Sequence, residues 1–153
     1  NRTLQIKDEL ERKRQLPFDR VWVVFDKDDF TDFNEAIQLA TSYSFQSAWT
    51  NEAFELWYLL HFQYLDAGIS RHDYIEKLQS EIRKHPGYEN YEYKKNDVSV
   101  YKMLTTIGNE DLAKRYAERL RSFFEDDEDY KEHKPCTTVD LLVRELENPE
   151  KLL

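Results

Sequence analysis

The sequence predicts an α/β fold in which a small parallel sheet is flanked by helices and followed by a helix-rich C-terminal half. An apolar run at residues 21–25 ends on clustered acidic residues, and a second apolar run spans residues 45–50. Between them, apolar residues recur at helical spacing. Two strands joined by a helix of this length form a right-handed β-α-β unit with parallel strands. Beyond Gly68 the apolar residues recur at helical spacing, which predicts further helices.

Composition sets broad limits on the class of protein. The chain has 153 residues, 40% of them hydrophobic, which is enough for one domain with its own core. A single cysteine, Cys136, cannot form an internal disulfide, and this favours a reducing compartment. Because the sequence has no apolar run of membrane-spanning length, we expect a cytoplasmic protein with no membrane partner. The net charge of −9 repels nucleic acid at long range, so binding would need a local basic face or a bridging metal ion.

The first two elements are a helix over residues 3–14, ended by Pro17, and a strand over residues 20–25. The helix is moderately amphipathic, with leucine and isoleucine residues among charges. The strand contains three valines and two aromatic residues without alternation of apolar and polar positions. Such a run is typical of a strand covered on both faces.

A helix over residues 32–43 follows the first strand, with Thr31 or Asp32 as its cap. The second strand, over residues 45–50, leads into an almost wholly apolar helix over residues 50–62 that we expect to lie centrally. Its polar residues lie at its start: Asn51, Glu52 and Glu55. Because parallel strands end on the same side of a sheet, these residues should lie near the acids that follow the first strand.

Four helices are predicted in the C-terminal half. The first spans residues 72–85, and the second follows a cap at Asp97 and ends at Gly108. Asn109 begins the third, and Thr137 or Thr138 caps the fourth. In the fourth helix the residues expected to face inward are Val139, Leu142, Val143 and Leu146. The acidic run at residues 125–129 is interpreted as a solvated loop.

The strongest candidate site is formed by Asp26 and Asp28 at the end of the first strand. If the extended conformation continues through them, two residues apart, their side chains leave on the same face. This geometry suits a divalent ion, because Mg²⁺ binds oxygen ligands and completes its shell with water and substrate phosphate. The alternative is structural, since acids are common at strand ends and before helices.

Three further features have two interpretations each. Glu55 either complements the dipole of its helix or belongs to the site. His61 lies on an aromatic face, which favours a hydrogen-bonded core histidine over a catalytic one. The tyrosines and lysines of residues 88–95 form either a base-stacking surface or an ordinary surface loop, and three nearby acids favour the loop.

The chain resembles the RloB family along most of its length and in the same order. The segments that carry the resemblance are Val21-Trp22-Val23-Val24-Phe25-Asp26-Lys27-Asp28-Asp29, Phe33-Asn34-Glu35-Ala36-Ile37, Asn51, Phe54-Glu55-Leu56-Trp57, Leu60-His61-Phe62 and Pro135-Cys136-Thr137-Thr138-Val139.

The resemblance implies a Toprim-like (Rossmann-like) domain from a prokaryotic defence or abortive-infection locus, often encoded beside an ATPase partner. Asp26 and Asp28 match the Asp-x-Asp pair with which Toprim domains bind Mg²⁺. The early acidic residue of that family pattern has no counterpart here. We therefore expect residues 1–153 to be a single domain that lacks its native N-terminal strand.

Two functions from different classes follow. The first is a metal-dependent nuclease in anti-phage defence, acting on DNA or RNA. In it Asp26 and Asp28 hold Mg²⁺ (or Mn²⁺), Asp29 joins them through water, and Glu55 or an acid from the missing first strand orients the attacking water. The residues expected to contact phosphate are Lys27, Lys94 and Lys95. The second is a non-catalytic sensing or adaptor module that docks on a partner ATPase, which the negative charge and the missing acidic strand favour.

Overall fold

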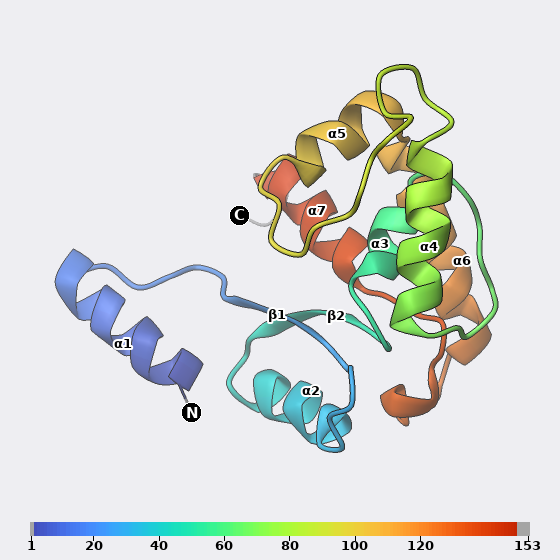
Figure 1. The fold of residues 1–153 in the computed structure, drawn as a ribbon. Helices are drawn as coiled ribbons and strands as arrows, with labels where there is room; N and C mark the ends of the chain where they lie inside the picture. The colour runs from blue at the N-terminus through green and yellow to red at the C-terminus, as the bar shows by residue number, and fades with distance from the viewer. Residues whose placement is uncertain (1, 150–153) are drawn as a thin grey trace.

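The computed structural model describes residues 2–149 and confirms the α/β class. Strands β1 (Trp22–Asp26) and β2 (Gln46–Thr50) run parallel, and helix α2 (Phe33–Ser42) connects them. The register pairs Trp22 with Gln46 and Asp26 with Thr50, so both strands end at the same sheet edge, as predicted. Within the described residues the sheet has these two strands alone (Figure 1).

Helices make up most of the remaining chain. They are α1 (Arg2–Arg14), α3 (Glu55–Leu59), α4 (Arg71–Ile82), α5 (Val100–Ile107), α6 (Glu110–Arg121) and α7 (Val139–Glu147), with 3-10 turns at Ser122–Phe124 and Tyr130–Glu132. Helix α1 has no buried residue and lies apart from helices α3 to α7 (Figure 1). Between residues 2 and 149, no helix has the length and apolar character needed to cross a bilayer.

The prediction that the first strand is covered on both faces is wrong. Every residue of β1 keeps some exposure, and Val24 is 52% exposed. Helices α2 and α7 both contact β2, and Thr138 covers the far edge of β2 by donating its N–H to the carbonyl of Trp49 at 2.8 Å. The second strand is therefore the inner one, and the first is an edge strand.

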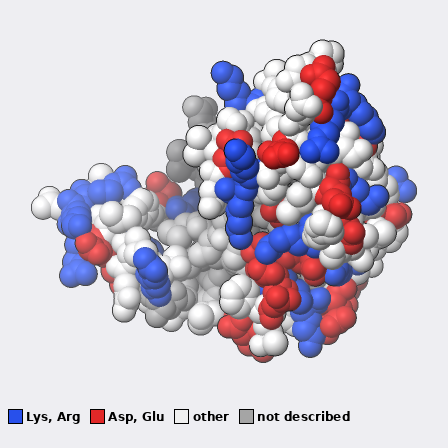
Figure 2. Space-filling view, in the orientation of Figure 1, with Lys and Arg blue, Asp and Glu red and all other residues white. Residues whose placement is uncertain are grey.

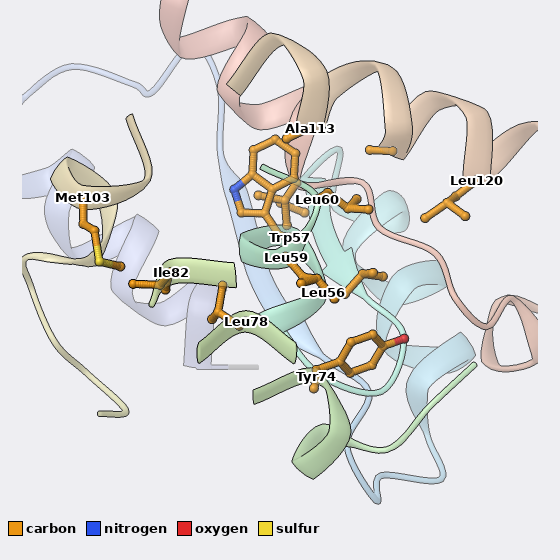
Figure 3. Close-up of a cluster of buried hydrophobic side chains, with 14 residues drawn as sticks. Leu56, Trp57, Leu59, Leu60, Tyr74, Leu78, Ile82, Met103, Ala113 and Leu120 are labelled. Atoms are coloured by element: carbon orange, nitrogen blue, oxygen red, sulfur yellow. The ribbon is translucent and has the colours of Figure 1, made fainter. Parts of the chain in front are cut away.

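The core is centred on α3, as predicted for the apolar helix after the second strand. Figure 3 shows Leu56, Trp57, Leu59 and Leu60 packed among side chains from α4, α5 and α6. A smaller cluster on the α2 side of the sheet contains Phe33, Ile37, Trp49 and Cys136.

The central helix is shorter than the predicted range of residues 50–62. Glu52 has a left-handed backbone with φ of 70°, which a right-handed helix does not allow, so the helix begins after it. At the other end, the N–H groups of His61 and Phe62 bond to carbonyls three residues earlier. The carbonyl of His61 accepts the N–H of Asn109 at 2.8 Å, which ties this turn to the start of α6.

Helix starts agree with the sequence only in part. The Asn109 side chain caps α6 by accepting the N–H of Leu112 at 2.8 Å, as predicted. Helix α5 begins at Val100, two residues later than expected, and the Asp97 carboxylate accepts the N–H of Ser99 at 2.9 Å in the turn before it.

Helix α7 begins after Thr138, but the Thr138 hydroxyl does not cap it. That hydroxyl accepts the N–H of Trp49 at 2.9 Å and donates to the carbonyl of Ser47 at 3.0 Å, which ties the helix to β2. Helix α7 is buried at its first turn, and Leu146 near its end is 70% exposed rather than turned inward.

Candidate functional site

Asp26, Asp28 and Arg71 meet at the C-terminal edge of the sheet. Arg71 Nη2 lies 2.6 Å from Asp26 Oδ2, and Arg71 Nη1 lies 2.9 Å from Asp28 Oδ2. All three side chains are between 29% and 39% exposed. The two aspartates are therefore presented together, as the sequence predicted, and a guanidinium bridges them.

A turn, not a continued strand, brings the two aspartates together. Strand β1 ends at Asp26, and Asp28 has a left-handed backbone with φ of 45°. The N–H of Phe30 closes the turn on the carbonyl of Lys27 at 3.0 Å, and the N–H of Asp28 donates to the carbonyl of Glu52 at 2.9 Å. Aspartate adopts this backbone region more readily than most residues do. The expectation that the extended conformation continues through Asp28 is therefore wrong.

Glu55, the first residue of α3, is the third carboxylate of the site. It is only 4% exposed, and its Oε1 accepts a hydrogen bond from the Tyr93 hydroxyl at 2.9 Å. Its Oε2 lies 3.8 Å from Arg71 Nε, too far for a hydrogen bond, and this Nε is buried without an acceptor. Three carboxylates, two from the end of β1 and the turn after it and one from α3, therefore surround the guanidinium of Arg71.

Burial and the negative charge of the site shift the pKa values of Arg71 and of two nearby tyrosines. Burial acts to lower the pKa of Arg71, but hydrogen bonding to Asp28 and the charges of the acids around it raise that pKa overall. Burial and the charge of Glu55 raise the pKa of Tyr58, and they raise that of Tyr93 more strongly. Arg71 therefore stays charged, and the Tyr93 hydroxyl stays a proton donor to Glu55.

A cavity of about 200 Å³ opens beside these groups. It is lined by Asp26, Phe54, Glu55, Tyr58, Arg71, Tyr93, Lys94, Lys95, Asn96, Asp97 and Val100. The exposed residues Lys94 and Lys95 thus reach the same cavity as the acids, although they lie far along the chain from the first strand. Acidic and basic groups line it together, which suits a phosphate ligand with an accompanying cation.

The carboxylate oxygens of Asp26 and Asp28 are suitable ligands for a hard divalent cation. Asp26 and Asp28 each use Oδ2 for Arg71, and their Oδ1 atoms make no hydrogen bond within the described chain. Among residues 2–149, no three His, Cys, Asp or Glu side chains stand together as a ready metal site. An ion at these aspartates would therefore take two protein ligands and complete its shell with water and phosphate, as Mg²⁺ often does.

Several predicted site residues do not join this group. Asp29 is exposed, and Lys27 Nζ lies 3.4 Å from the carbonyl oxygen of Asp28 and does not line the cavity. The Asn51 amide turns away from the aspartates and donates to the carbonyls of Tyr130 and Lys131, both at 2.9 Å. Glu52 pairs with Lys134 at 2.7 Å.

His61 is a core histidine, the interpretation that the sequence favoured. Its ring is buried, and Nδ1 lies 2.9 Å from the carbonyl oxygen of Trp57. Burial lowers its pKa. His61 therefore contributes to packing rather than to the cavity.

Arg71 and Tyr93 are the site residues that the sequence did not reveal. Arg71 lies 45 residues from Asp26 in the chain and starts a helix among other charged residues, so no spacing signals it. Tyr93 did have a signal, because it directly precedes Lys94 and Lys95 in the aromatic and basic segment.

Comparison with known protein families gives a match over almost the whole chain. The model of a family described as RloB-like protein matches residues 2–146. No curated protein and no solved structure matches the chain.

Proposed function

Because the chain belongs to the RloB-like family, we propose that it is a Toprim-like domain that cleaves phosphodiester bonds of nucleic acid with a divalent metal ion, in prokaryotic anti-phage or abortive-infection defence. The observation that supports this most is the convergence of Asp26, Asp28 and Glu55 on one cation beside a cavity lined by lysines. Clustered acids of this kind are the groups that two-carboxylate Mg²⁺ sites use.

Each residue has a proposed role. Asp26 and Asp28 hold Mg²⁺ or Mn²⁺, with Asp29 contributing through water. When bound, such an ion polarises the phosphate and activates water. Glu55, held by the Tyr93 hydroxyl, accepts a hydrogen bond from the attacking water and orients it.

The phosphate contacts in this proposal come from lysines. Lys94 and Lys95 line the cavity and place positive charge beside the acids. Lys27, adjacent to Asp28 in the chain, adds positive charge at the same sheet edge. The substrate is DNA or RNA, whose phosphates these cations neutralise.

Aspartate-to-asparagine substitutions test the metal site. Asp26→Asn and Asp28→Asn should each weaken Mn²⁺ binding, followed by electron paramagnetic resonance, by at least about tenfold, since even hydrogen-bond partners of metal ligands have effects of that size. Both variants should also lose metal-dependent cleavage of labelled oligonucleotides. Asparagine tolerates the left-handed backbone at position 28, so the turn survives the substitution.

The matched control is Asp66→Asn, which removes one exposed carboxylate away from the cavity. Its Mn²⁺ affinity and cleavage should equal those of the unchanged chain. Equal Mn²⁺ binding by Asp26→Asn, Asp28→Asn and the control would show that the aspartates hold no metal.

A second function, an adaptor or sensing module that docks on a partner ATPase, is favoured by one observation. Arg71 already bonds to both aspartates at 2.6 and 2.9 Å, as the cation of a purely structural ion pair does. In that case Mn²⁺ would show no saturable binding at Asp26 and Asp28, and both asparagine variants would keep their binding to the ATPase.

A further inference from the structure

The charges around Arg71 do not balance. Asp26, Asp28 and Glu55 carry three formal negative charges, and the guanidinium that they surround carries one positive charge. Two of the carboxylates bond to it directly, and the third is 3.8 Å from its Nε. The side chains of Asp26 and Asp28 are also 29% and 39% exposed, unlike the acid of a sealed structural ion pair. The acids therefore have capacity for more positive charge than Arg71 supplies.

A metal ion and Arg71 compete for the charge of the same two carboxylates, although Arg71 bonds only to their Oδ2 atoms. A cation held by Asp26 and Asp28 would lie next to the guanidinium that now bonds to both Oδ2 atoms. A metal ion and a guanidinium that share the same carboxylates repel each other. This repulsion grows as water is excluded from the site. Metal binding at the aspartates therefore requires that Arg71 give up at least part of its contacts with them.

The cavity offers Arg71 another partner. The guanidinium lines the cavity together with Lys94 and Lys95, and its Nε is a donor without an acceptor. A guanidinium binds a phosphate through parallel N–H donors, the same fork that it now divides between two aspartates. A phosphate in the cavity would thus replace the aspartates as acceptors for this fork.

We infer that Arg71 joins the lysines of the cavity in contacting phosphate and that it exchanges partners, bonding to Asp26 and Asp28 in the metal-free chain and to a substrate phosphate once a divalent cation takes the aspartates. This inference rests on the proposed function. It makes metal and phosphate binding mutually dependent, because each ligand removes a competitor of the other.

Substitution of Arg71 separates the two halves of the exchange. With the full chain, Arg71→Gln should bind Mn²⁺ about tenfold more tightly than the unchanged chain in the absence of nucleic acid, because the competing guanidinium is gone. The same variant should bind a phosphorothioate thymidine oligonucleotide about tenfold more weakly in the presence of Mn²⁺, because a bidentate phosphate contact is lost. Calorimetry measures both affinities.

The matched control is Lys77→Gln, which removes one exposed positive charge from the same helix, α4. It should leave both affinities within about twofold, since an exposed charge is screened by solvent and salt. Arg71→Lys keeps the charge but not the fork, and should show the loss of oligonucleotide affinity with a smaller gain in Mn²⁺ affinity. Circular dichroism melting checks that each variant is folded.

The outcomes separate this inference from the proposed function. Mn²⁺ binding that depends on Asp26 but is the same in Arg71→Gln and the unchanged chain overturns the exchange and leaves the metal site intact. A gain in Mn²⁺ affinity without loss of oligonucleotide affinity also overturns it. If neither Arg71→Gln nor the unchanged chain binds Mn²⁺, both the exchange and the metal-dependent function are overturned.

Discussion

Two arginine–aspartate contacts in this chain differ in burial, and burial separates a structural role from a functional one. Asp140 is fully buried and accepts hydrogen bonds from both terminal nitrogens of Arg121, with Arg144 Nε at 3.6 Å. Arg71 instead divides its nitrogens between two aspartates that remain open to solvent. A buried carboxylate cannot exchange its partner without leaving a charge unpaired, whereas a half-exposed one exchanges it at small cost.

Removal of the Asp140 charge should therefore destabilise the fold. Asp140→Asn removes the buried carboxylate that accepts the hydrogen bonds of Arg121, whose own side chain is 24% exposed, and is expected to lower the free energy of unfolding by about 2 kcal/mol. Urea denaturation measures this change. Glu118→Gln, which removes a surface partner of Arg144, serves as the control and should stay within about 0.5 kcal/mol. Equal midpoints for the two variants would contradict the structural role of Asp140.

For single residues, the sequence predicted the acids of the candidate site, Asp26 and Asp28, and did not reveal their counter-ion, Arg71. Asp26 and Asp28 could be found because they interrupt an apolar strand, a pattern that is local. Arg71 could not, because its contact with Asp26 spans 45 residues and depends on where the packing of α4 against α3 places the first residue of α4. The turn at Asp28 was equally hidden, since a left-handed aspartate leaves no pattern in neighbouring residues.

At the scale of elements, patterns of apolar residues predicted which helices and strands exist, and tertiary contacts decided where they begin and end. The β-α-β unit formed as predicted because its first strand is a continuous apolar run and the apolar residues of the helix that follows recur at helical spacing. Helix α3 is shorter than predicted, and in the turn after it Asn109 bonds to the carbonyl of His61, a contact between distant segments. The exposure of β1 depends on which strand the helices cover, and a strand's own sequence does not contain that information.

The junction of α3, α5 and α6 depends on the small size of Gly108. A Cβ at this position would lie 2.6 Å from the carbonyl oxygen of Leu104 and 2.9 Å from His61 Cβ. The backbone there is extended and allowed for any residue, so the constraint is steric. Gly108→Ala should therefore lower the free energy of unfolding by about 1–3 kcal/mol, as overpacking of a core does. Thermal and urea unfolding both measure it.

Gly87 provides the contrasting case for this prediction. It has a left-handed backbone with φ of 87°, and a Cβ there would meet nothing within 4 Å. Gly87→Asn should change stability by about 1 kcal/mol or less, because asparagine tolerates this backbone region. A Gly108→Ala variant as stable as Gly87→Asn would mean that α5 and α6 can move apart without cost.

At the scale of the whole molecule, charge opposes the approach of nucleic acid. The net charge is −9, and Figure 2 shows basic side chains mixed with acidic ones over the visible face rather than gathered into a basic surface. Nucleic acid bound to this chain would therefore be held by few cations and by a metal ion. The residues that line the cavity supply three such cations: Arg71, Lys94 and Lys95.

The number of cations fixes how strongly salt should weaken binding. Three phosphate contacts on a single strand predict a slope of about −2 for the logarithm of affinity against the logarithm of salt concentration. Fluorescence anisotropy of a labelled phosphorothioate oligonucleotide at fixed Mn²⁺ measures this slope. Lys94→Gln and Lys95→Gln should each make it shallower by about 0.7, while Lys13→Gln, on exposed α1, should leave it unchanged.

A steeper slope that ignores Lys94 and Lys95 would place nucleic acid on another face of the molecule. Such binding would need many phosphate contacts to overcome the net negative charge, and each contact would add to the salt dependence. A shallow slope that changes when Lys94 or Lys95 is substituted would instead place the nucleic acid at the cavity. It requires that the strand enter the cavity beside Asp26 and Glu55, because these acids and both lysines line the same 200 Å³ space.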